Sequence, residues 1–95
     1  MTIMTHKQIT YDDFDRLLLQ AGYIHGYTRG AHKLYEHTSS GTILLFPTMP
    51  GSTIVSDAHL VAARKLSVER GVVEEDEFDR LLAAAEEGHK RAAVS

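Results

Sequence analysis

The feature of the sequence that most constrains the fold is a run of three short β-type segments between Gly22 and Pro47. Each segment is rich in β-branched and aromatic residues, and only short turn-forming breaks separate them. The pattern predicts a three-stranded antiparallel meander in strand order 1-2-3, ended by Pro47. Because the third segment is apolar on both faces, we expect it to be the best-covered strand. The three segments are Ile24 to Arg29, His32 to Thr38 and Thr42 to Phe46, with breaks at Gly30-Ala31 and Ser39-Ser40-Gly41.

A helix precedes the meander. Thr10, with Asp13 three residues later, forms a variant of the capping box that begins many helices. Apolar side chains then recur at helical spacing up to Ala21, and Gly22 supplies a left-handed stop. We therefore expect the first helix to run from about Tyr11 to Ala21.

Two further helices follow the meander. Ser56 or Asp57 caps the second helix, which ends at Gly71. The third helix begins in the acidic run Glu74 to Glu77, where negative charge suits the helix dipole, and Gly88 closes it. The tail from 89 to 95 shows no periodicity, and we expect it to be frayed and flexible.

The element order is therefore α-β-β-β-α-α, which predicts an α+β two-layer domain with the helices on one face of the sheet. We expect the first and second helices to pack on that face and the third to extend beyond them. The chain has 95 residues, of which 43% are hydrophobic and 24% charged, so it has enough apolar surface for one core and lacks the composition of a disordered chain. We predict a single domain over residues 1–88.

Composition excludes several classes of function. The chain has no cysteine, so disulfides, thiolate zinc sites and cysteine nucleophiles are absent. The longest apolar run, Ile43 to Phe46, is far shorter than the ~20 residues that cross a bilayer. Residues 1–10 lack the apolar core of a secretory signal, so we expect a cytoplasmic protein.

The net charge of −3 is unevenly distributed along the chain. Both ends are acidic, whereas the region from Arg16 to Arg70 carries more bases than acids and most of the histidines. This middle region is predicted to present a mildly basic face. Acidic residues at the starts of helices explain this uneven charge equally well, without a binding partner.

Four sequence features resemble one known family. The first helix closes in Leu19-Gln20-Ala21-Gly22-Tyr23, and the second strand opens with Arg29-Gly30-Ala31-His32-Lys33-Leu34-Tyr35. His37 precedes a turn and a strand that ends in proline, and Leu60 to Phe78 combines a helix, a glycine, a hydrophobic pair, acids and a phenylalanine. This pattern resembles the HicA-type toxins of bacterial type II toxin-antitoxin pairs, over about Tyr11 to Phe78. The resemblance implies a double-stranded-RNA-binding-domain-like fold, an mRNA interferase activity and a HicB-like antitoxin partner.

Within this resemblance, His32 occupies the position of the family's motif histidine. An imidazole exchanges protons near neutral pH, and RNA cleavage requires removing a proton from a 2'-hydroxyl or giving one to the leaving oxygen. We therefore expect His32 to be the general acid or base of an endoribonuclease that needs no metal or organic cofactor. An ordinary exposed histidine beside a turn is the alternative.

Several residues are candidate RNA contacts. Arg29 and Lys33 flank His32 and are positioned in sequence to hold a phosphate, although charges that protect a strand edge have the same pattern. Tyr27 and Tyr35 are candidates for stacking on bases, with packing in the sheet as the alternative. The predicted RNA-binding residues are Arg29, Gly30, Lys33, Tyr35, Arg64 and Lys65.

The histidines of the meander do not predict a metal site. A two-residue hairpin at Gly30-Ala31 places His25 and His32 on one face of the sheet and His37 on the other. No cluster of acidic residues accompanies them. A three-histidine site is therefore not expected, although a bulge at Gly30 would reverse these face assignments.

The sequence leaves two other functions open. Ala31 stands where the resembled family usually has serine, and the loop from Thr48 to Val55 contains no lysine or arginine. These differences favour an RNA-binding or protein-interaction module that lacks catalysis, or a purely structural subunit. For a toxin, we expect an antitoxin that covers His32, supplies acids to the neighbouring cations and buries roughly 1,200 to 2,000 Å².

Overall fold

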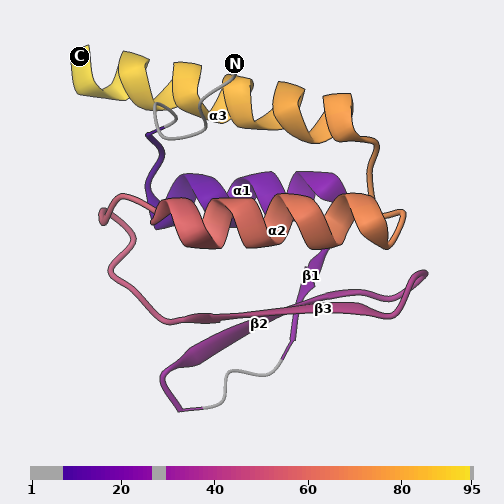
Figure 1. Cartoon of the computed structure of the whole chain (residues 1–95). Coiled ribbons are helices and arrows are strands. Elements are labelled where there is room, and N and C mark those ends of the chain that lie inside the picture. The colour runs from indigo at the N-terminus through magenta and orange to yellow at the C-terminus, as the bar shows by residue number, and fades with distance from the viewer. Residues whose placement is uncertain (1–7, 27–29, 95) are drawn as a thin grey trace.

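The computed structural model describes residues 8–26 and 30–94. Its elements follow the predicted order and form the predicted α+β fold (Figure 1). All three helices lie on the same side of the sheet, α1 and α2 next to it and α3 stacked on the far side of that pair. The elements are α1 (Tyr11–Ala21), β1 (Ile24–His25), β2 (His32–His37), β3 (Thr42–Pro47), α2 (Asp57–Glu69) and α3 (Glu75–Val94).

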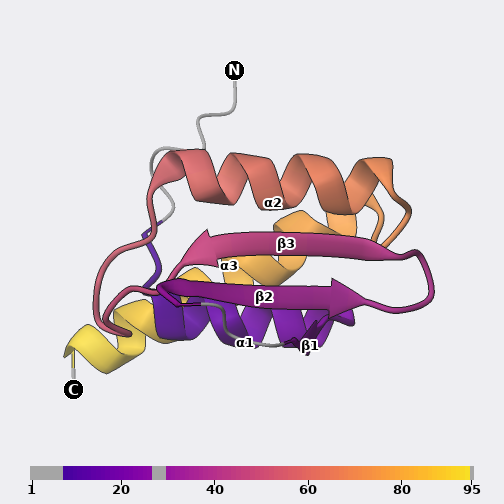
Figure 2. The same ribbon diagram turned by 90° about the horizontal axis from the view of Figure 1, so that it is seen from below.

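The sheet is antiparallel with strand order β1-β2-β3, as predicted. His32 lies opposite Pro47 at one end of the β2–β3 pair, and His37 lies opposite Thr42 at the other. One face of the sheet meets α1 and α2, and the opposite face is bare (Figure 2). The fold therefore gives this small domain an uncovered sheet surface.

Local sequence explains where α1 and α2 begin and end. The Thr10 side chain accepts from the Asp13 backbone, and the Asp13 carboxylate accepts from the Thr10 backbone at 3.0 Å, which completes the predicted capping box. Gly22 ends α1 with a φ of 113°, a conformation that favours glycine. Ser56 caps α2, as predicted.

The third helix differs from the prediction because it continues through Gly88 to Val94. A glycine inside a helix costs only about 1 kcal/mol relative to alanine, so packing can outweigh it. Here the second half of α3 runs along α1, with His89 Nδ1 3.7 Å from Asp13 Oδ2. The predicted end at Gly88 was therefore wrong.

The first strand spans Ile24–His25 and does not include Gly26, and the predicted continuation over residues 27–29 lies outside the described part of the chain. The third strand is not covered on both faces, because one face of the sheet is bare. Ile43 and Leu45 are 52% and 53% exposed, while the residues that alternate with them are buried.

The core lies between the sheet and the helices. It contains one buried polar pair, in which the Tyr23 hydroxyl and the Ser67 hydroxyl are 2.7 Å apart. Within the described residues, every buried polar side-chain atom has a hydrogen-bond partner. No helix in that part of the chain is both long enough and apolar enough to span a membrane. The largest fully buried apolar side chains are Ile9, Phe14, Leu17, Leu18, Tyr23, Leu60, Phe78 and Leu82, and the rings of Tyr35 and Phe46 are also buried in the core.

Candidate functional site

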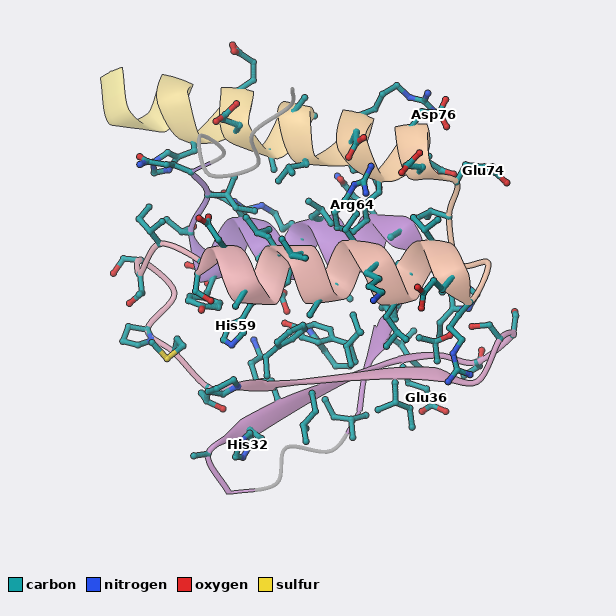
Figure 3. All side chains as sticks on the ribbon, viewed as in Figure 1. His32, Glu36, His59, Arg64, Glu74 and Asp76 are labelled. Atoms are coloured by element: carbon teal, nitrogen blue, oxygen red, sulfur yellow. The ribbon has the colours of Figure 1, made fainter. Side chains whose placement is uncertain are left out.

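His32 is the first residue of β2 and lies on the bare face of the sheet (Figure 3). It follows the turn at Gly30, whose φ of 56° is left-handed. Its side chain is exposed, and among residues 8–26 and 30–94 no hydrogen bond or ion pair engages its imidazole. The ring is therefore open to a ligand that approaches from below the sheet.

The surroundings of His32 on the bare face are mostly apolar. Side chains on a strand alternate between faces, so Leu34 and Glu36 share this face with His32. Ile43 and Leu45 of β3 lie opposite them in the strand register. The surface thus carries His32 at one end, Glu36 at the other and branched aliphatic side chains between.

Lys33 is not beside His32. It points to the helix side of the sheet, where its Nζ lies 3.4 Å from Asp15 Oδ1 and 5.8 Å from the centre of the Tyr35 ring. Successive residues of a strand face opposite ways, so neighbours in sequence are separated by the sheet here. Arg29 and Tyr27 lie outside the described residues.

Tyr35 packs in the core, with only 3% of its surface exposed. Its hydroxyl donates to Asp15 Oδ1 at 2.5 Å. Burial raises the pKa of Tyr35 above its ordinary value, and the hydrogen bond to Asp15 adds to that shift. The structure therefore shows Tyr35 packed in the sheet and not stacked on a base, because a buried ring has no exposed face on which a base can stack.

The structure reveals a polar cluster on Asp15 that sequence reasoning did not predict. Besides Tyr35 and Lys33, His25 binds the same carboxylate oxygen, with His25 Nε2 2.7 Å from Asp15 Oδ1. Burial acts to raise the pKa of Asp15, but the hydrogen bonds from Tyr35 and His25 and the charge of Lys33 outweigh it and lower the pKa. Asp15 thereby joins α1 to both β1 and β2.

This cluster also corrects the predicted face of His25. His25 lies opposite Tyr35, so it shares the helix-side face with Tyr35 and His37 and not with His32. The reason is the register, because β1 pairs with β2 one residue away from the predicted alignment, with His25 opposite Tyr35 and not opposite Glu36. A one-residue change of register reverses every face assignment.

Arg64 and Lys65 are also remote from His32. Arg64 points away from the sheet toward α3 (Figure 3) and binds Asp79 through two nitrogens, at 2.8 and 3.0 Å, and Glu75 at 3.1 Å. The hydrogen bonds to Asp79 raise the pKa of Arg64. Arg64 therefore links α2 to α3, and the exposed Lys65 is the more accessible cation.

His59 is another histidine whose contacts were not predicted from the sequence. It points from α2 toward the sheet (Figure 3). Its Nδ1 lies 2.8 Å from the Tyr11 hydroxyl, and its ring centre lies 5.1 Å from that of Phe46. His59 therefore joins an aromatic cluster. In the described part of the chain, no group of three histidine or acidic side chains is placed to hold a metal.

A small hollow lies on the helix side of the sheet, opposite the face of His32. Tyr11, Lys33, Pro47 and neighbouring residues line it, and its volume is about 60 Å³. Pockets for small molecules are usually larger, about 300–1,000 Å³.

No family model matches the chain, and neither a curated protein nor a solved structure matches it.

Proposed function

We propose that this protein is an endoribonuclease of the mRNA-interferase kind, in which His32 acts as the general acid or base. The observation that carries the proposal is the position of His32. Its imidazole is exposed, without a partner among the described residues, at the end of a bare sheet face. The α-β-β-β-α order and the Gly30-x-His32 motif agree with the resemblance to HicA-type toxins.

The chemistry needs one well-placed imidazole. The RNA 2'-hydroxyl loses its proton to His32 and attacks the adjacent phosphorus, which releases the 5'-oxygen of the next nucleotide. The leaving oxygen takes a proton from water or from the imidazolium. The products are a 2',3'-cyclic phosphate and a 5'-hydroxyl, and every proton is accounted for without a metal.

The bare face supplies room for the substrate. Single-stranded RNA presents unstacked bases that pack on apolar and aromatic side chains, and Leu34 and Leu45 lie beside His32. Phosphate contacts are proposed from Gly30 beside His32 and from Arg29, which lies outside the described residues, with Lys65 as a separate exposed cation. Lys33 points to the helix side of the sheet and is not counted among them. Because Lys33 and Arg64 already bind acids, we expect a weak dependence of RNA affinity on salt.

A second candidate function is a protein-interaction module without catalysis. It is favoured by the aliphatic side chains of the bare face, since Ile24, Ile43 and Leu45 are each about half exposed. The same surface suits a HicB-like antitoxin if the protein is a toxin. The two functions are thus compatible with one interface and differ in whether His32 reacts.

Purified protein incubated with RNA and with DNA of the same sequence tests the proposal. We expect the RNA to be cut into fragments ending in 2',3'-cyclic phosphate and 5'-hydroxyl, and the DNA to stay intact because it lacks the 2'-hydroxyl. If RNA survives, or if DNA is cut at the same rate, the proposed mechanism is wrong.

Co-expression with the product of the adjacent gene, followed by size-exclusion chromatography, tests the partner. A toxin should elute with its antitoxin. A chain that elutes without that product, and that leaves cells healthy when expressed by itself, would favour the catalytically silent module.

A further inference from the structure

The outer edge of β3 is a free hydrogen-bonding surface. Thr48 N donates to Ala31 O at 2.6 Å, which continues the β2–β3 register by one pair. Bonded pairs alternate along an antiparallel ladder, so the backbone groups of Ile43, Leu45 and Pro47 point away from β2. In residues 8–26 and 30–94, no segment pairs with this edge.

This edge has little of the usual protection against pairing. Exposed edges in monomeric proteins commonly carry charges or proline, or are very short. The opposite edge of the sheet, β1, has only two residues. By contrast, β3 has six residues, Thr42–Pro47, and none is charged. Pro47 removes one outward-pointing donor at the end of the strand, and the outward N–H groups of Ile43 and Leu45 remain free to pair.

The helix next to this edge presents an exposed stripe of two alanines and a valine, followed by Lys65. Figure 2 shows α2 running along the β3 side of the sheet, whereas α1 runs along the β1 side. The exposed residues Ala58, Val61, Ala62 and Lys65 recur at the i, i+3, i+4 and i+7 positions of one helix face. Val61 is 48% exposed. The free edge and this stripe therefore lie on one side of the molecule.

We propose that two copies of this chain pair through β3 and α2. In an antiparallel pair about a twofold axis, Ile43 N–H donates to the carbonyl of the partner's Leu45, and Leu45 N–H donates to the carbonyl of the partner's Ile43. The two sheets then form one continuous sheet. The aliphatic side chains of Ile43 and Leu45 pack against those of the partner on the bare face.

The small side chains of α2 favour a second copy of this chain as the partner that binds the β3 edge. Pairing at the strand spacing of about 4.8 Å brings the two α2 helices together, and alanines allow an approach to the short end of the ~8–10 Å range. A strand from another protein would form hydrogen bonds with the β3 edge but would leave the exposed stripe of α2 uncovered. The dimer does not depend on the proposed RNA chemistry and leaves His32 exposed.

Analytical ultracentrifugation across about a hundredfold range of protein concentration tests the dimer. We expect a monomer–dimer equilibrium for the wild type and a monomer for Ala62→Glu, because two like charges meet near the twofold axis. Ala83→Glu is the matched control: it adds the same charge at an exposed position of α3 and should dimerise like the wild type.

Amide hydrogen exchange on the wild type provides a test that needs no variant. The N–H groups of Ile43 and Leu45 should be protected more strongly as protein concentration rises, while other exposed amides exchange at a constant rate. A chain that stays monomeric, with these two amides exchanging at the same rate at every concentration, would overturn the proposal and leave the edge for a different protein's strand.

Discussion

The substitution Asp15→Asn tests the polar cluster that joins α1 to the sheet. The Asp15 side chain is 21% exposed and one of its oxygens receives hydrogen bonds from Tyr35 and His25, with Lys33 nearby. A hydrogen bond to a charged group contributes about 1.5–3 kcal/mol. We expect Asp15→Asn to lose about that much stability, a fall in Tm on the order of 10 °C for a domain of this size.

The pH dependence of this loss is fixed by the direction of the pKa shift. The folded-state pKa of Asp15 lies below the ordinary value of 3.8, so folding favours the carboxylate. The stabilisation is present in full well above that value and is lost as pH falls through the folded-state pKa. The stability difference between wild type and Asp15→Asn should therefore shrink between about pH 7 and pH 3.

Urea unfolding at several pH values measures both quantities. Asp76→Asn is the control, because Asp76 is an exposed helix residue whose ion pair with Arg80 is worth little. We expect that variant to lose no more than about 0.5 kcal/mol. Equal losses for the two variants, or a loss for Asp15→Asn that does not change with pH, would refute the role given to Asp15.

Further outcomes follow from other contacts. Replacing Arg64 with Met should destabilise the protein in urea unfolding by about 1 kcal/mol while leaving the salt dependence of RNA binding unchanged, because Arg64 binds acids of α3. Lys33→Ala should leave the salt dependence of RNA binding unchanged in a titration, because Lys33 binds Asp15 on the helix side of the sheet, and a slope reduced by about one unit would return Lys33 to the RNA contacts. Gly88→Ala should raise Tm, because alanine favours a helix and an added Cβ meets nothing within 4 Å. Gly71→Ala should lower Tm, because Gly71 has a left-handed φ of 75° that strains any other residue.

The sequence predicted the elements whose signals are local. Capping at Thr10 and Ser56 and the left-handed glycine after α1 placed two helices correctly, because those signals act within a single turn. The end of α3 was missed at Gly88, since packing on α1 depends on residues far away in the chain. The apolar run of β3 was taken for a covered strand, yet an apolar run does not indicate whether helices cover both faces of the sheet or only one.

The site was less predictable than the fold. The exposed position of His32 beside a turn was expected from the glycine that precedes it, and the structure places it so. The partners of Lys33 and Arg64 were not predictable, because their acids come from α1 and α3. The cluster on Asp15 was hidden because it depends on the register of β1 against β2, and that register decides which face His25 occupies.

The rate of RNA cleavage by His32→Ala, compared with Glu36→Gln, tests the central claim most directly. Both residues lie on the bare face of β2, His32 at one end and Glu36 at the other, so Glu36→Gln changes a polar group of the same face away from the proposed site. General acid or base catalysis is worth about 10²–10⁴ in rate, so we expect His32→Ala to lose at least ~100-fold while its Tm stays near that of the wild type. Glu36→Gln should cleave at the wild-type rate. Equal cleavage by the wild type and a folded His32→Ala, in preparations free of contaminating ribonuclease, would contradict the assignment of His32.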